Sequence, residues 1–203
     1  MDVTDRLESE RRIREILDAA IRTLATALEK RDPYTAGHQR RVADLTRRMA
    51  CLLGLDEEAC HGLYLGSLLH DIGKIAVPAE ILSSPRRLTP AEFQIIQSHC
   101  EVGWEILREV AFPWPVADMV RHHHERMDGS RYPDGLRGED ISREARLLAV
   151  ADVAEAMASH RPYRPALGLQ AAIEELQAHR GIRYDEEAVD ACVQVIRSHG
   201  IGD

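Results

Sequence analysis

The chain has 203 residues, of which 44% are apolar and 30% charged, a composition typical of a globular protein with one good core. Its formal net charge of −8 argues against duplex nucleic acid and against an anionic membrane as partners. The four cysteines lack C-x-x-C spacing, and neither a signal peptide nor a membrane-spanning apolar stretch is evident. We therefore expect a cytoplasmic protein with reduced thiols.

Residues 7–31 have the apolar spacing of an amphipathic helix. Its predicted apolar stripe consists of Ile13, Leu17, Ala20, Leu24 and Ala27. Steps of four and three residues are typical of a two-stranded coiled coil, which would make residues 1–31 a dimerisation element. The alternative is a first helix that packs on its own domain. Both interpretations stay open at this point.

Residues 32–203 predict one helical domain. Thr89 and Glu92 have the spacing of a capping box around Pro90, and Asp185 stands where it can cap the last helix. Glycine and proline in residues 126–141 predict a long loop. No segment shows the alternation of a strand, so the predicted fold class is all-α. The expected helices lie after Pro33 to about 53, and at about 56–71, 89–110, 115–124, 142–159, 166–179 and 185–198.

The pentapeptide His70-Asp71-Ile72-Gly73-Lys74 places an imidazole beside a carboxylate at the end of an apolar run. The two oxygens of Asp71 can bridge two metal ions while His70 binds one of them. Alone, the pair could equally be a helix end with a favourable histidine. The rest of the chain must therefore supply the remaining ligands.

Four more ionisable residues fall on the apolar stripes of their predicted helices, where a polar group needs a partner. They are His38, His99, His123 and Asp152. Each alone is more often a hydrogen-bonded core residue, but no equal number of inward cations offsets the set. Imidazole with carboxylate suits Fe, Mn, Zn, Ni or Co, and the absence of thiolates argues against a structural zinc site. The ligands exceed the needs of one ion, which predicts a two-metal centre for phosphoryl displacement.

With these residues, the chain resembles the HD-GYP family, a branch of the HD-domain metal-dependent phosphohydrolases that hydrolyse the bacterial messenger cyclic di-GMP. The similarity runs from about Asp32 to Asp190. Its motifs are Asp32–His38, His70–Lys74, His99, His123-His124-Glu125, Asp128–Pro133, Val150–Val153 and Arg161-Pro162-Tyr163-Arg164. The resemblance implies a helical HD-domain bundle with metal ligands at His38, His70, Asp71, His99, His123, His124 and Asp152. Among these, His124 depends on the resemblance alone.

The resemblance also implies roles in substrate binding. Lys74 would contact the scissile phosphate or help the leaving oxygen, although a cation at a helix end is the alternative. Tyr132 would touch the substrate, and Arg161 and Arg164 would grip its phosphates or a guanine edge. Nearby, Glu125 would orient a ligating imidazole or be a surface charge, and His122 would be a solvated neighbour.

Three departures from the family pattern affect these expectations. Arg131 replaces the first glycine of the GYP triplet. A positive φ costs arginine about 1 kcal/mol or more, so the loop could be rearranged there. Alternatively, Arg131 could add a phosphate contact or narrow the pocket. Tyr34 stands where some members of the family have a glutamate, as in a three-metal design. Tyrosine is a poor substitute ligand, which favours two metals in this chain. Glu155 replaces a frequent aspartate.

The implied activity is hydrolysis of cyclic di-GMP by a hydroxide that bridges two divalent transition metal ions, with Fe or Mn preferred. The product is pGpG, and further hydrolysis to GMP stays open. Asp71 and Lys74 would be the catalytic residues. One alternative is an HD-type hydrolase of another cyclic dinucleotide, such as 3′,3′-cyclic GMP–AMP, or of a nucleotide. The other is a catalytically weak domain that binds cyclic di-GMP and signals through the first helix.

Overall fold

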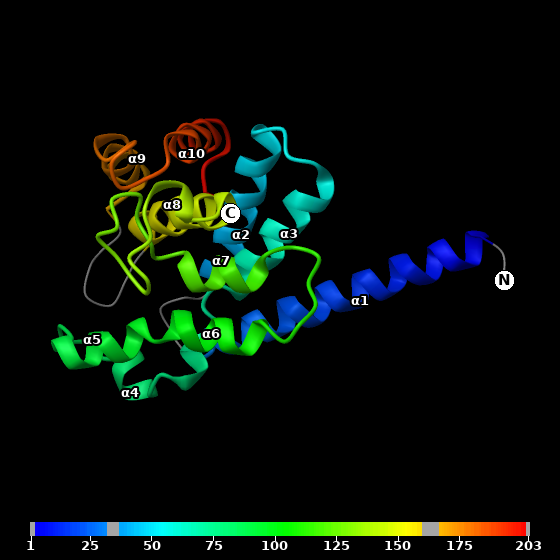
Figure 1. Cartoon of the computed structure of the whole chain (residues 1–203), viewed down its shortest axis with the longest axis horizontal. Helices are drawn as coiled ribbons and strands as arrows, with labels where there is room; N and C mark the ends of the chain where they lie inside the picture. The colour runs from blue at the N-terminus through cyan, green and yellow to red at the C-terminus, as the bar shows by residue number, and fades with distance from the viewer. Residues whose placement is uncertain (1–2, 32–36, 160–166, 202–203) are drawn as a thin grey trace.

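A computed structural model describes residues 3–31, 37–159 and 167–201. Within these ranges the regular elements are helices, with two isolated β-bridges and no strand, which confirms the all-α class (Figure 1). The helices are α1 Val3–Glu29, α2 His38–Leu52, α3 Glu57–Leu69, η1 Ile72–Ala76, α4 Ala79–Leu82, α5 Pro90–Gln97, α6 His99–Leu107, α7 Val116–His122, η2 Gly138–Asp140, α8 Arg143–Ala158, α9 Leu169–Ala178 and α10 Glu186–His199. None of these helices has the length and hydropathy needed to cross a membrane.

Helix α2 lies between α3 and α8, and α10 covers the side of this layer away from α1 (Figure 1). The apolar face of α2, which includes Val42, Leu45 and Met49, is buried in the largest hydrophobic cluster. Smaller clusters join α1 to α3 and join η1 to α6 and α7. The first residue of α2 and the end of α3 are thereby held at one end of the layer.

The sequence signals for helix ends were mostly correct. Thr89 and Glu92 form the predicted capping box, and the Asp185 side chain accepts a hydrogen bond from Ala188 N. The single helix expected at 89–110 was wrong, because it is divided at Ser98 into α5 and α6. The Ser98 hydroxyl and the His99 ring donate to the carbonyls of Ile95 and Ile96, at 2.7 and 2.6 Å. These side chains compete with the backbone bonds of a continuous helix.

The stripe predicted for the first helix does not pack on this domain. Ile13, Leu17 and Leu24 are 55%, 57% and 43% exposed. The face one residue further on, with Ala25 and Leu28 buried, packs against the body instead. The N-terminal part of α1 extends beyond the other helices (Figure 1). Packing on α3 and an unpartnered apolar stripe thus coexist on one helix.

The tightest approach of two elements near the His-Asp motif occurs at Gly73 in η1. A Cβ atom there would lie 1.9 Å from His99 O and 2.6 Å from Gly103 N, both of them backbone atoms of α6. Because backbone atoms cannot rotate away, only glycine lets η1 and α6 meet at this distance. This contact positions the segment that follows His70 and Asp71.

We expect Gly73→Ala to lower the free energy of unfolding by about 3 kcal/mol, because the added methyl group forces η1 away from α6. Urea denaturation measures this change. Gly54→Ala is the matched control, since its Cβ would meet nothing within 4 Å and only its φ of +74° is unfavourable. The control should lose about 1 kcal/mol. Equal losses in both variants would contradict the steric explanation.

Candidate metal centre

Helix ends supply most of the predicted metal ligands. His38 and His99 are the first residues of α2 and α6, His70 and Asp71 directly follow α3, and His123 and His124 directly follow α7. Asp152 comes from the middle of α8. Among these residues, His124 is partly exposed and the others are buried. The structure therefore brings all seven predicted side chains to one place in the protein interior.

The distances link these side chains into one cluster. His38 Nε2 and His70 Nε2 lie 3.2 and 3.9 Å from Asp152 Oδ1. The two oxygens of Asp71 lie 3.4 Å from His70 Nε2 and 3.4 Å from His99 Nε2, respectively. His99 Nε2 is 3.4 Å from His123 Nε2. Asp71 thus stands between two groups of imidazoles, as a bridging ligand would.

Three of the imidazoles are fixed in the same orientation. His70, His99 and His123 each place Nδ1 within 2.6–2.8 Å of the backbone carbonyl three residues earlier. A carbonyl oxygen only accepts, so Nδ1 must donate and Nε2 keeps its lone pair toward the cluster. Metal-binding histidines are oriented by a hydrogen bond of this kind.

The two carboxylates at the centre stay ionised despite their burial. Burial works against the charged form of Asp71, but Lys74 and His70 outweigh it and hold its pKa well below the usual value. Lys74 Nζ lies 2.7 Å from Asp71 Oδ2. Asp152 is likewise buried, and its hydrogen bond to His38 keeps its pKa low. Both acids therefore carry negative charge at neutral pH.

The imidazoles differ in their protonation. Burial lowers the pKa of His123 to about 3 and also lowers the pKa values of His99 and His124. These three rings are neutral at pH 7 and can offer lone pairs to a metal ion. For His38, burial is outweighed by hydrogen bonds to Asp152 and Glu155, which raise its pKa to about 9.

The donor set fits two divalent metal ions. Three groups have ligand atoms within 4.8 Å of one another: His38 with His70 and Asp152, His70 with Asp71 and His123, and His99 with Cys100, His123 and His124. Imidazole and carboxylate donors match Fe, Mn, Zn, Ni or Co. The sequence interpretation overlooked Cys100, whose Sγ lies 3.6 Å from His99 Nε2. Burial raises the pKa of this thiol, so it is a weaker donor than the imidazoles.

Glu155 orients His38 from behind. Its carboxylate accepts a hydrogen bond from His38 Nδ1 and forms an ion pair with Arg41 at 2.6 Å. Glu155 is completely buried, and each of its two carboxylate oxygens has a partner, His38 on one and Arg41 on the other. The replacement of the family's aspartate by a longer glutamate is therefore accommodated, with Nε2 of His38 still directed at Asp152.

The loop after α7 is held by Glu125, which is buried rather than a surface charge. Its Oε1 accepts hydrogen bonds from the backbone N–H groups of Asp134 and Gly135, at 2.7 and 2.9 Å. It therefore supports the loop and does not contact a predicted ligand through these bonds. The Tyr132 ring that this loop carries lies 4.9 Å from the His124 ring. Tyr132 in turn meets Phe93 of α5 edge to face, at 6.4 Å.

One expectation for this region was wrong. His122 is buried instead of solvated, because its ring nitrogens lie 2.9 Å from Asp118 and 3.0 Å from Asp134. Arg131 has no positive φ, since within the described ranges only glycines do. The loop therefore takes arginine at this position without a left-handed backbone conformation. Arg131 is exposed beside Tyr132. The predicted positions Tyr34, Arg161 and Arg164 lie outside the described residues.

Glu29 and Arg31, at the end of α1, bind the backbone beside His38 and the backbone that follows Lys74. The sequence did not reveal these contacts. The two oxygens of Glu29 accept hydrogen bonds from Gly37 N and Gln39 N, at 2.9 and 3.0 Å, on either side of His38. Arg31 donates to the carbonyls of Ile75 and Val77, which follow Lys74. No spacing signal marks such side chain to backbone contacts across separate elements.

Gln39 was also overlooked. It is 3% exposed, and its Oε1 has no hydrogen-bond partner among the residues that the structure describes. It lines a small cavity together with Asp71 and Lys74. A buried amide oxygen without a partner is costly, so this position favours a donor that enters the cavity. Its place directly after His38 was the only available sequence signal.

Comparisons with known proteins agree with this geometry. A family model described as "HD domain" matches residues 22–188. The chain is 41% identical over 189 residues to the cyclic di-GMP phosphodiesterase response regulator RpfG of Xanthomonas campestris pv. campestris, covering 92% of this chain and 49% of that protein. It is 35% identical over 183 residues to 3′3′-cGAMP-specific phosphodiesterase 1 of Vibrio cholerae, covering 90% and 42%.

A solved structure has the same fold. The cyclic GMP-AMP-specific phosphodiesterase V-cGAP3 of V. cholerae matches with a TM-score of 0.68 at 19% identity, over 90% of this chain and 49% of that chain. At this identity the likeness concerns the fold alone. The chain spans about half the length of these relatives.

Metal binding should stabilise the fold, because an ion that binds only the folded cluster shifts the unfolding equilibrium. We expect Mn²⁺ to raise the Tm of chelator-treated protein by about 5 °C or more. Asp71→Asn should remove most of this shift, since it removes the negative charge that lies between the two groups of imidazoles. The control is Asp140→Asn, an exposed acid in η2 that should keep the full shift. If neither Mn²⁺ nor Fe²⁺ changes the Tm of the unaltered protein, the proposed metal centre is contradicted.

Proposed function

Because the chain belongs to the HD domain family, we propose that it is a metal-dependent phosphodiesterase that hydrolyses cyclic di-GMP to pGpG, and slowly on to GMP. The observation that carries this proposal is the convergence of buried imidazoles whose Nε2 atoms are directed at two ionised carboxylates. Curated relatives of this part of the chain are named cyclic di-GMP phosphodiesterases.

In this proposal, His38, His70 and Asp152 hold one divalent ion, and His99, His123 and His124 hold the other, with Asp71 between them. Fe or Mn is preferred, and Zn, Ni or Co fits the same donors. When bound, the ions would supply activation of water and neutralisation of phosphoryl charge.

The remaining residues would bind and orient the substrate. Lys74 places its ammonium group at Asp71, where it can contact a phosphoryl oxygen as charge develops. Tyr132 and Phe93 form an aromatic wall that leads outward from His124, and a base can stack on such a surface. Arg131 is exposed at this wall and can meet a phosphate. Arg161 and Arg164 stay predictions.

A second candidate substrate is 3′,3′-cyclic GMP–AMP. Several curated relatives are named cGAMP-specific phosphodiesterases, at 35–37% identity. Arg131 in place of the family's glycine is the feature of this chain that could alter base selection. A catalytically weak receptor is less well supported, because a domain that only binds ligand has little use for the full donor set. A cytoplasmic location is likewise proposed, on the basis of four free thiols.

We expect protein loaded with Mn²⁺ or anaerobic Fe²⁺ to hydrolyse cyclic di-GMP faster than 3′,3′-cyclic GMP–AMP or cyclic di-AMP in a side-by-side panel. Lys74→Met should lower kcat about 100-fold at unchanged metal content, because a charge that stabilises the transition state is removed. Lys30→Met is the matched control, since it removes the chain's other lysine, which lies exposed at the end of α1.

The results separate the candidates. Preference for cyclic GMP–AMP would replace the substrate but keep the chemistry. Tight binding of cyclic di-GMP without product under both metals would refute the enzyme and favour the receptor.

We further propose that α1 forms a coiled coil with a second copy of this chain. Ile13, Leu17 and Leu24 repeat at heptad spacing along one exposed face. Leu17 and Leu24 stay exposed even though the neighbouring α1 residues Arg14 and Asp18 pair with Glu58 and His61 of α3. In aqueous solution, an apolar stripe of this length is normally covered by another protein surface.

Size-exclusion chromatography with light scattering should therefore give twice the chain mass. The combined change Leu17→Glu and Leu24→Glu should give the mass of one chain, because four charges would meet at the seam. Leu167→Glu, which alters an exposed leucine elsewhere, should leave the dimer intact. A monomeric unaltered protein at micromolar concentration would rule out this dimer.

A further inference from the structure

Two cysteines approach each other outside the metal centre. Cys51 in the last turn of α2 and Cys60 in the first turns of α3 place their Sγ atoms 3.2 Å apart. Both are free thiols. The other two cysteines are placed differently, with Cys100 beside His99 and Cys192 buried in the core. Nothing in the proposed hydrolysis uses the Cys51–Cys60 pair.

The turn between α2 and α3 holds the two thiols in place. Leu55 N donates to Ala50 O at 3.1 Å, and Gly54 N donates to Cys51 O at 3.1 Å. The side chain of Asp56 then caps α3 by accepting from Ala59 N at 2.7 Å. These hydrogen bonds fix the turn and keep the two thiols close together. A disulfide of about 2.05 Å requires the sulfur atoms to approach by only about 1 Å.

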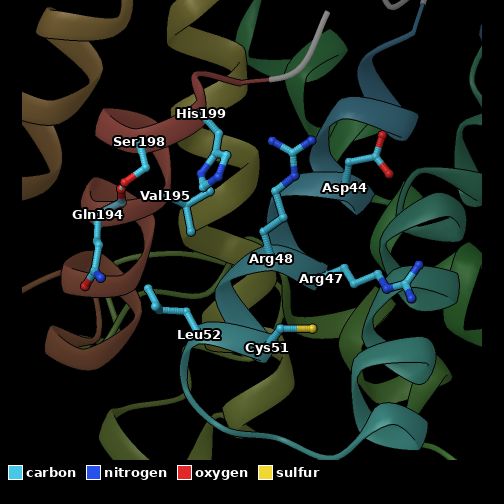
Figure 2. Close-up of a pocket in the computed structure, with 9 residues that line it drawn as sticks. All are labelled: Asp44, Arg47, Arg48, Cys51, Leu52, Gln194, Val195, Ser198 and His199. Atoms are coloured by element: carbon cyan, nitrogen blue, oxygen red, sulfur yellow. Dashed lines mark hydrogen bonds between the residues drawn. The ribbon is translucent and has the colours of Figure 1, made fainter.

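The two thiols differ in access. Cys51 is exposed at the edge of a groove of about 690 Å³ between α2 and α10 (Figure 2). Cys60 is buried. Arg47 and Arg48 lie one turn before Cys51 and line the same groove. In the described part of the chain, no carboxylate lies within ion-pair distance of either arginine.

Cys60 has the opposite environment. Burial and the neighbouring Cys51 raise its pKa to about 11, so it stays a thiol at neutral pH. Its Sγ also lies 3.5 Å from Leu55 O, which accepts a hydrogen bond from the thiol. An oxidant that enters the groove therefore contacts Cys51 first, and the buried Cys60 thiol lies next to Cys51.

We propose that Cys51 and Cys60 are a site of reversible oxidation that forms a disulfide when the protein meets a hydroperoxide. The Cys51 thiolate attacks one peroxide oxygen, the O–O bond breaks, and the leaving hydroxide takes up a proton to become water. Cys60 then attacks the sulfur of the Cys51 sulfenic acid, forming the S–S bond while its proton leaves with the hydroxyl group as a second water. Two thiols are oxidised by two electrons, and one peroxide is reduced.

The disulfide would join α2 to α3 at the end opposite the metal centre. Cys51 lies about 20 Å along α2 from His38, at 1.5 Å per residue. The crosslink therefore leaves the ligands untouched while it closes the turn covalently. Closing a loop this short is expected to raise the Tm by about 5 °C. This inference does not depend on the proposed hydrolase activity.

The test uses the whole protein, exposed to a small excess of hydrogen peroxide, then denatured and alkylated with N-ethylmaleimide. We expect four alkylated cysteines before oxidation and two after it, with a peptide map that links Cys51 to Cys60. Dithiothreitol should restore four thiols and reverse the rise in Tm. Cys192→Ser is the matched control and should still form the crosslink.

Cys51→Ser alters an exposed side chain and should fold, keep its basal activity and form no crosslink. Cys60→Ser should instead accumulate a sulfenic acid at Cys51 that reacts with dimedone. The proposal is overturned if peroxide leaves all four thiols alkylatable. It is equally overturned if Cys51 gains oxygen without a link to Cys60, or if Cys51→Ser still loses two thiols.

Discussion

Two buried carboxylates, Asp71 and Asp152, set the terms for the arrangement of the helices. A carboxylate taken out of water needs opposite charge or hydrogen-bond donors around it, or it becomes protonated. Here imidazoles from α2, α6, the end of α3 and the end of α7 surround the two acids. The core must therefore bring four helix ends to one point, and the contacts at Gly73 and Glu155 allow this convergence.

The fold class and most helix boundaries followed from local signals. Capping residues such as Thr89 and Asp185 act within one turn of their helix, so the sequence carries them directly. His38 and Asp152 were found for a related reason. A polar group on an apolar helical stripe must face the interior, and four such groups together require a common partner. Their convergence is a consequence of packing that periodicity can detect, whereas the metals they would hold are not settled by it.

Long-range contacts were not predictable. The apolar stripe of α1 pointed to residues that remain exposed, because α3 is met by the face one residue further on, with Ala25 and Leu28. His122 looked like a solvated member of a histidine run, yet Asp134 of the following loop reaches back to it. Glu29 and Gln39 resemble ordinary helix residues in the sequence. The Glu29 carboxylate binds backbone groups of another element, and the Gln39 amide oxygen is buried by tertiary packing, so no spacing within one helix marks either residue.

Glu29 and Arg31 give the first helix a direct connection to the chemistry. One carboxylate grips the backbone on both sides of His38, and one guanidinium grips the carbonyls just beyond Lys74. Helix α1 extends about 40 Å from this point, at 1.5 Å per residue. A movement of α1 would reach the backbone at His38 and the segment after Lys74 together, and it would also disturb the packing of Ala25 and Leu28 against α3. The first helix therefore ties two segments of the ligand set to each other from outside the domain.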